Sequence, residues 1–176
     1  MIHKVKKILV PVDFSDRSTN GLKFAASLAR EVRAELLLLH VLDKKERHFF
    51  MGSLAIAEGA PMRMRDSNPI PLDRLVMEKA LDLYHFIHEA LGNAVDLRIS
   101  RRVRIGKPTK EIIRVANEEK VDLIVLAMRK VSLLSFLSTR GEWLKLLWKF
   151  PCPVLLAPSV PRSWASPKEP LISWQT

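Results

Sequence analysis

The sequence predicts an α/β fold with three layers, in which a doubly wound, five-stranded parallel sheet is covered by helices on both faces. Short apolar runs alternate with helical patterns along the chain in the order β-α-β-α-β-α-β-α-β, which is typical of such a sheet. Of the 176 residues, 48% are hydrophobic, which is enough for one substantial core and suits a single domain.

Five segments have the pattern of strands. Four are nearly continuous apolar runs, as expected of parallel strands that are buried on both faces; they are 7–12, 35–42, 121–128 and 153–158. In the fifth, 96–105, one side carries Leu97, Ile99, Val103 and Ile105, and the other carries Arg98, Ser100, Arg102 and Arg104, with Arg101 as the exception. This alternation indicates a half-exposed edge strand whose arginines protect it from pairing with other chains.

Four segments between the strands have the pattern of helices: 15–34, 71–92, 108–119 and 141–150. Ser15 or Ser18 is expected to cap the first, and proline and glycine stand in their favoured places at the two ends of the second. The residues expected to face the core are Leu22, Ala25, Ala26, Ala29 and Val32 in the first helix, Leu72, Leu75, Val76, Leu83, Phe86, Ile87 and Ala90 in the second, and Ile112, Ile113 and Ala116 in the third.

Two segments fall outside this alternation, so we expect a domain over 1–158, with a long insertion loop at 43–70, and a tail over 159–176. The insertion shows no amphipathic period, which favours a mobile or partner-covering loop over a membrane contact. Prolines exclude a regular helix in the tail. Its Trp164 and Trp174 are expected either to pack on the domain or a partner, or to belong to a disordered end.

The charge and the cysteine content limit the class of protein. The formal net charge is +10, but the basic residues are spread along the chain without interleaved aromatic residues, so the sequence does not favour nucleic-acid binding. No apolar stretch is long enough to span a bilayer, and the first residues lack the pattern of a cleavable signal. A single cysteine, Cys152, excludes an internal disulfide and is compatible with the cytoplasm, where we expect the protein.

No set of residues in the sequence combines an acid, a base and a nucleophile, so we expect no catalytic residue. His85 and His88 have a spacing that can hold a metal, but no carboxylate pattern accompanies them and no metal site is predicted. We expect His40 to be buried or capped at a strand end, and Cys152 to be a small core-side residue.

Three segments of the chain read KILVPVDFSDRS, GKPTKEIIRVANEEKVDLIVLA and FPCPVLLAP. In this order and spacing they resemble the universal stress protein family, over about residues 6–158. The resemblance implies a Rossmann-like sheet of the adenine nucleotide alpha hydrolase type, with strand order 3-2-1-4-5, and a homodimer formed through the last strand. The apolar run 153–158 would otherwise be an exposed edge, which independently favours the dimer.

Members of that family that bind ATP carry the pattern Gly-x2-Gly-x9-Gly-[Ser/Thr] after the fourth strand. This chain keeps the spacing, with Ala127, Lys130, Arg140 and Gly141, but none of the four residue types. A phosphate-binding loop needs glycines because backbone N–H groups must approach the phosphate oxygens closely, often at positive φ. We therefore expect ordinary ATP binding to be lost.

Residues that match the adenine end of the family's site are present in this chain, although Asp13 can equally be a strand-end carboxylate that caps the next turn, and the apolar ones would be strand residues in any case. Asp13 matches the aspartate that lies by the ribose and the adenine, and Pro11, Val12 and Val41 match the positions that frame the adenine. A retained adenine end beside an altered phosphate end favours adenosine or AMP over ATP.

Two functions are consistent with these observations. The first is a universal-stress-type regulatory or protective protein, dimeric and non-enzymatic, with weak or no ATP binding and no firm cofactor, that acts through protein partners contacted by the insertion and the tail. The second is an adenine-nucleotide (ATP or AMP) binding protein that uses Asp13 and a rebuilt basic phosphate loop. In that loop Arg129, Lys130 and Arg140 would hold the anion through their side chains, with slow hydrolysis as a further option.

Overall fold

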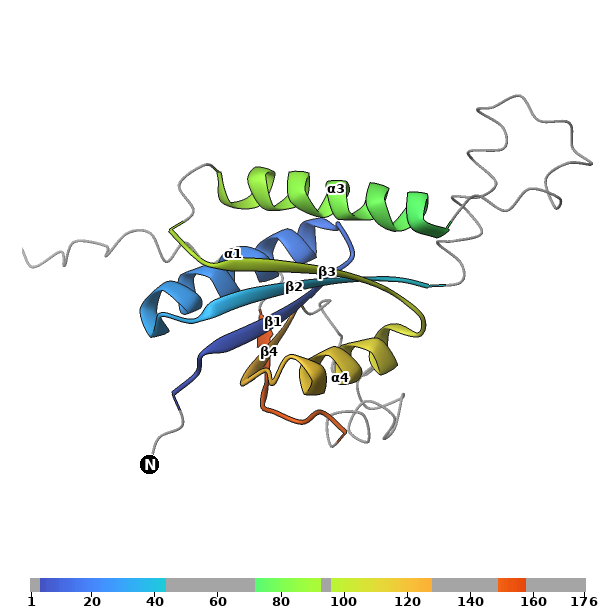
Figure 1. The fold of residues 1–176 in the computed structure, drawn as a ribbon. Coiled ribbons are helices and arrows are strands. Elements are labelled where there is room, and N and C mark those ends of the chain that lie inside the picture. Colours follow the sequence, from blue (N-terminus) through green and yellow to red (C-terminus); the bar gives the residue numbers. More distant parts are fainter. Residues whose placement is uncertain (1–3, 44–71, 93–95, 128–148, 158–176) are drawn as a thin grey trace, which may run out of the picture.

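The five predicted strands form one parallel sheet (Figure 1). The structure, a computed structural model, describes residues 4–43, 72–92, 96–127 and 149–157. The strands are β1 (Lys7–Val12), β2 (Glu35–Leu42), β3 (Ile99–Ile105), β4 (Leu123–Ala127) and β5 (Val154–Ala157). They lie in the order β3-β2-β1-β4-β5, and each pairs in parallel with its neighbours. The predicted fold class and strand order are both confirmed.

Three helices are described, and they cover both faces of the sheet. They are α1 (Asp16–Val32), α3 (Leu72–Leu91) and α4 (Pro108–Glu118). Helices α1 and α3 lie on one face and α4 lies on the other (Figure 1). The predicted helix at 141–150 lies largely outside the described residues, as do the insertion beyond Asp43 and the tail, so the predicted domain boundaries stay predictions.

The central strands send alternate residues to opposite faces, which explains why their apolar runs are continuous. The residues of β1 and β2 that are buried against α1 and α3 are Ile8, Val10, Val12, Leu36 and Leu38. Those that are buried on the side of α4 are Leu9, Leu37 and Leu39. One layer of strands therefore supports two apolar clusters.

Most of the helical residues that were predicted to face the core are buried, and a few are not. The predicted residues that are buried are Leu22, Ala25, Ala26 and Ala29 of α1, Leu75, Leu83, Phe86, Ile87 and Ala90 of α3, and Ala116 of α4. Val32 and Val76 are only partly buried. The prediction was wrong for Leu72, which is 47% exposed because it occupies the first position of α3, at the end of the helix. Ile112 and Ile113 are half-buried, whereas Val115, which was not predicted, is fully buried because it packs with Ala116 on β1 and β2.

Helix α1 passes so close to β4 that one of its positions has no room for a side chain. A Cβ atom on Gly21 would lie 2.9 Å from the Cβ of Ala127, at the carboxyl end of β4. Carbon atoms pack at about 3.5–4.0 Å. The alanine at position 127 therefore requires the glycine at position 21.

Gly21→Ala should lower the free energy of unfolding, although alanine is the better helix former by about 1 kcal/mol. The reason is the overlap with Ala127, and overpacking of this kind costs about 1–3 kcal/mol. In an Ala127→Gly background the same change should be neutral or stabilising, because the opposing Cβ is gone. Urea unfolding of the four proteins in this double-mutant cycle measures both effects. An equal effect of Gly21→Ala in the two backgrounds would contradict the contact.

Candidate functional site

A pocket of about 490 Å³ opens where β1, β2 and β4 end. Strands β1 and β4 are neighbours in the sheet although β2 and β3 separate them in the sequence, so the winding of the sheet reverses between them. Ligands of doubly wound sheets bind at this position, beyond the carboxyl ends of the strands. The lining residues are Pro11, Val12, Asp13, Ser18, Leu39, His40, Val41, Asp43, Pro108, Ile112, Leu126 and Ala127.

Five of the predicted site residues come together in this pocket, namely Pro11, Val12, Asp13, Val41 and Ala127. The remaining four, Arg129, Lys130, Arg140 and Gly141, lie outside the described residues. Asp43 also lines the pocket and was not predicted, although it directly follows β2 just as Asp13 directly follows β1, and this strand-end position was the available signal. Pro108 and Ile112 reach the pocket from the first turns of α4, a contact that no local pattern indicates.

The turn between β1 and α1 holds the Asp13 carboxylate in place. Its Oδ1 accepts hydrogen bonds from the backbone N–H of Ser15 at 3.2 Å, from the Ser15 hydroxyl and from the Ser18 hydroxyl. The backbone N–H of Asp13 donates to Ser18 Oγ at 3.0 Å. Ser15 is also the N-cap of α1, since its side chain accepts from the N–H of Ser18. The expectation that one of these serines caps the helix is confirmed for Ser15.

These contacts keep Asp13 ionised. Partial burial by itself would raise the pKa of this carboxyl, but the hydrogen bonds from Ser15 and Ser18, together with the charge of Arg17, hold the pKa below its ordinary value. Three donors already occupy Oδ1, whereas the nearest ion-pair partner of Oδ2 is Arg17 at 4.0 Å. With the side chain 65% exposed, the carboxylate can accept a hydroxyl or amino donor from a ligand.

His40 forms the inner wall of the pocket. It is buried, and its Nδ1 lies 3.0 Å from the carbonyl oxygen of Val12, so that the ring ties β2 to the neighbouring β1. Its ring also contacts that of Phe14, with the centroids 4.4 Å apart. The expectation of a buried or capped strand-end histidine is confirmed.

The charges of the pocket favour a ligand that donates hydrogen bonds. Among the lining residues that the structure describes, Asp13 and Asp43 are the acids, and none is a lysine or arginine. Two carboxylates repel a polyphosphate but accept hydrogen bonds from sugar hydroxyls or an amino group. The described part of the pocket therefore suits a nucleoside better than a triphosphate.

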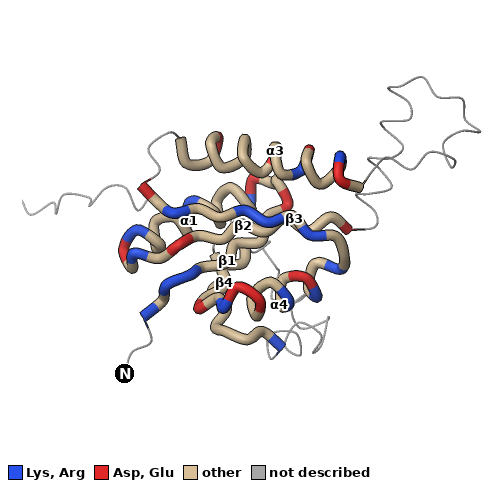
Figure 2. The backbone as a smooth tube through the Cα atoms, viewed as in Figure 1, with Lys and Arg blue, Asp and Glu red and all other residues tan. Residues whose placement is uncertain are grey.

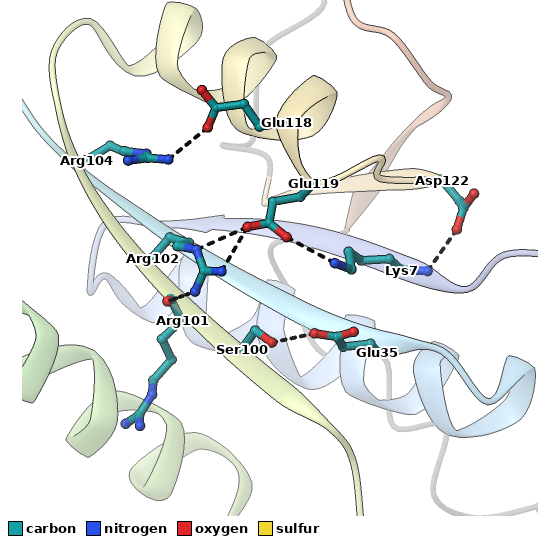
Figure 3. A network of polar contacts seen from close by, with 9 residues as sticks. All are labelled: Lys7, Glu35, Ser100, Arg101, Arg102, Arg104, Glu118, Glu119 and Asp122. Atoms are coloured by element: carbon teal, nitrogen blue, oxygen red, sulfur yellow. Dashed lines mark hydrogen bonds and ion pairs between the residues drawn. The ribbon is translucent and has the colours of Figure 1, made fainter.

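Two of the three arginines of β3, Arg102 and Arg104, form ion pairs, whereas Arg101 lies over the ring of Tyr84 (Figure 3). Arg102 donates from Nε and Nη2 to Glu119 Oε1 at 3.1 and 2.9 Å. Lys7 Nζ binds the other carboxylate oxygen of Glu119 at 3.1 Å. Arg104 pairs with Glu118 at 2.8 Å. These carboxylates compensate the basic stripe that Figure 2 shows along β3, which weighs against a nucleic-acid site there.

Arg102 also protects the exposed edge of the sheet. Its Nη1 donates to the backbone carbonyl oxygen of Arg101 at 3.0 Å. Alternate residues of β3 turn their carbonyls toward β2, as Arg98 does in accepting from Leu36. Arg101 has the opposite parity, so its carbonyl faces the open edge. The predicted role of the arginines as edge protection is supported for Arg102.

The remaining candidates are not joined into a reactive site. His85 and His88 are exposed and both lie beside the ring of Tyr84, and no group of three metal-ligating side chains occurs in the described parts of the chain. Cys152 is half-buried; burial, helped by Asp122, raises the pKa of its thiol, which is therefore protonated at neutral pH. None of the helices that the structure describes combines the length and apolarity that a membrane crossing requires.

Comparison with known proteins gives related sequences over most of the chain. A family model described as the universal stress protein family matches residues 4–158. Universal stress protein MJ0577 of Methanocaldococcus jannaschii is 29% identical over 124 residues, which cover 69% of this chain and 75% of that protein. Universal stress protein YxiE of Bacillus subtilis is 29% identical over 152 residues, which cover 85% of this chain and 97% of that protein.

Solved structures of similar proteins have the same fold. A universal stress protein in complex with cAMP has a TM-score of 0.56 at 16% identity and covers 89% of this chain and 99% of its own. The universal stress protein of Archaeoglobus fulgidus in complex with dAMP has a TM-score of 0.51 at 18% identity, with 87% and 98% covered. At these identities the likeness shows the arrangement of sheet and helices.

Glu119→Gln should make the protein less sensitive to acid. The hydrogen bond from Lys7 lowers the pKa of Glu119 most, and Arg102 lowers it further, against the opposing effect of burial. A carboxylate with a depressed pKa stabilises the fold above its ordinary pKa of about 4.5, and this contribution is lost as the pH falls through the lower folded value. At pH 7 we expect the variant to lose about 1 kcal/mol of stability, a difference that should shrink toward pH 3.

Urea unfolding of both proteins at pH 7, 5, 4 and 3 measures this difference. Glu89→Gln, on the exposed side of α3, is the matched control and should keep the wild-type dependence on pH. A stability difference for Glu119→Gln that stays constant from pH 7 to pH 3 would contradict the role of the Lys7–Glu119–Arg102 contacts.

Proposed function

Because this chain belongs to the universal stress protein family, we propose that it is a regulatory or protective protein, dimeric and non-enzymatic, whose pocket binds adenosine or AMP and has little or no affinity for ATP. The observation that carries the proposal is the pocket itself, whose lining includes the fixed Asp13 carboxylate and Ala127. Its location in the cytoplasm remains a prediction from the single cysteine.

The nucleoside end of the pocket has the chemistry that an adenosine needs. Pro11, Val12 and Val41 present apolar surface for a base, and the ionised Asp13 is available to accept from ribose hydroxyls. Two proteins of the same fold were solved with adenine monophosphates, cAMP in one and dAMP in the other. Those ligands support the class of ligand proposed for this chain.

The phosphate end is altered. Ala127 stands where the ATP-binding members of the family have the first glycine, and its Cβ is packed against Gly21 of α1. A side chain at this position keeps the backbone N–H groups from approaching phosphate oxygens as a glycine would allow. With Asp13 and Asp43 in the same pocket, added phosphates also meet like charge.

Adenosine and AMP should raise the melting temperature, and ATP should not. A ligand present at a hundred times its Kd stabilises by about 2.7 kcal/mol, or about 5–10 °C for a chain of this length. Asp13→Asn should bind adenosine about tenfold more weakly or worse, because it loses a charged acceptor. Asp96→Asn, which removes a surface carboxylate paired with Arg30, should bind like the wild type.

Thermal melts with each ligand and calorimetric titration of the two variants provide the measurement. No shift with any of the three compounds would end the nucleoside proposal. A larger shift with ATP than with AMP would favour the second function, in which Arg129, Lys130 and Arg140 hold the phosphates, and phosphate release would then test for slow hydrolysis.

The last strand supports the proposed dimer. Strand β5 forms the edge of the sheet opposite β3, and its Leu156 is 46% exposed. Whereas Arg102 covers a carbonyl at the β3 edge, the β5 segment Val154–Ala157 carries only apolar residues. An apolar edge strand of this kind pairs readily with a second copy.

Leu156→Arg should convert the dimer to a monomer. The substitution places a charge in a contact between two apolar strands, and we expect the dissociation constant of the dimer to rise about thirtyfold or more. Light scattering coupled to gel filtration over a range of concentrations measures it. Leu81→Arg, at a leucine of α3 that is 56% exposed, is the control and should remain dimeric. A wild-type monomer at high concentration would contradict the proposed dimer.

A further inference from the structure

On the basis of the nucleoside pocket proposed above, we propose that Phe14 is a positioning residue. Its ring is clamped between α3 and His40, which keeps the backbone of residue 14 in the left-handed conformation and thereby directs the Asp13 carboxylate and the start of α1 into the pocket. Phe14 does not line the pocket itself.

The backbone of Phe14 has a φ of 58°, in the left-handed region. Among the described residues other than glycine, Arg33 and Lys120 share this feature, but both lie just past the end of a helix, where a left-handed residue commonly terminates the hydrogen bonding. Phe14 lies instead between a strand and a helix, beside a pocket. A left-handed conformation is unfavourable for a residue with a Cβ, and it persists where the surroundings impose it.

Contacts of the Phe14 side chain with β2 and α3 impose this conformation. The ring lies 4.4 Å from the ring of His40 on β2 and 5.6 Å, edge to face, from the ring of Phe86 on α3. The ammonium group of Lys79, about two turns before Phe86 on the same side of α3, lies 5.7 Å from the centroid of the Phe14 ring. His40 and Phe86 are both buried. The ring is therefore held by two elements that do not belong to the turn.

The conformation of residue 14 decides how its two neighbours face each other. Asp13 precedes it and Ser15 follows it, and all three donors to Asp13 Oδ1 come from Ser15 and Ser18. Rotation about the N–Cα bond of Phe14 would move the first turn of α1 relative to Asp13 and separate these donors from the carboxylate. The same contacts connect α3 to the pocket, because Phe86 and Lys79 contact the ring of Phe14, which directly follows Asp13.

Comparison of Phe14→Ala with Phe14→Gly tests the proposal. Both variants lose the ring, but only alanine retains the Cβ that disfavours positive φ. In Phe14→Ala we expect the turn to open, the pKa of Asp13 to rise toward its ordinary value and adenosine to bind about tenfold more weakly. In Phe14→Gly the left-handed conformation is again accessible, so both properties should lie closer to the wild type. The pKa is followed by NMR titration of the Asp13 carboxyl carbon, and Arg17, His40 and Asp43 are the neighbouring charged or titratable groups to follow with it.

Leu83→Ala is the matched control, since Leu83 is fully buried on α3 in the same apolar cluster. It should lower the melting temperature and leave the pKa of Asp13 unchanged. An unchanged pKa of Asp13 in Phe14→Ala, or an equal rise in Leu83→Ala, would overturn the positioning role. If Phe14→Ala does not fold, Phe14→Leu replaces it under the same criterion. Because the Asp13 titration needs no ligand, a wild-type protein that binds no adenosine would refute the proposed function while the role of Phe14 is still decided.

Discussion

Strands β1 and β2 lie at the centre of the sheet, and their apolar side chains are buried on both faces. Leu36 to Leu39 are four consecutive residues without solvent exposure, and burial of each leucine contributes roughly 1.5–3 kcal/mol. Within this core, β1 pairs with β2 in a single parallel register. That register sets Val12 opposite His40 and brings Asp13 and Val41 to the same edge of the sheet. The position of the pocket therefore follows from the pairing of these two strands.

The two edge strands of this sheet differ in their residues: β3 carries arginines and β5 is apolar. On β3, Arg102 and Arg104 pair with carboxylates at the end of α4, and Arg102 also covers a backbone carbonyl. On β5 no charged residue is present. A net charge of +10 thus does not by itself indicate an anionic partner, because two arginines of the densest basic segment are paired with carboxylates within the molecule. The apolar edge at β5 is the one through which we propose that the dimer forms.

Much of the candidate site followed from the order of elements in the sequence. In a doubly wound sheet the residues after each strand converge. Asp13, Val41 and Ala127 were predicted from the family resemblance and lie at these strand ends, and Asp43 satisfied the same rule. The contributions of Pro108 and Ile112 did not follow, because they depend on where α4 lies over the strand ends. The contact between Gly21 and Ala127 could not be predicted either. A glycine within a helix can be required for several reasons, and only the short distance to β4 identifies the reason at this position.

The sequence by itself determined the fold class, the edge position of β3 and the edge of the sheet at which the pocket opens, because these depend on local periodicity and on the direction of parallel strands. The tertiary structure decided which side chains meet. Lys7, Arg102 and Glu119 come from β1, β3 and the end of α4, and the ring of Phe14 meets residues of β2 and α3. Such contacts join positions far apart in the chain, and no local pattern encodes them, since each requires the complete packing of helices on the sheet before its distance is set.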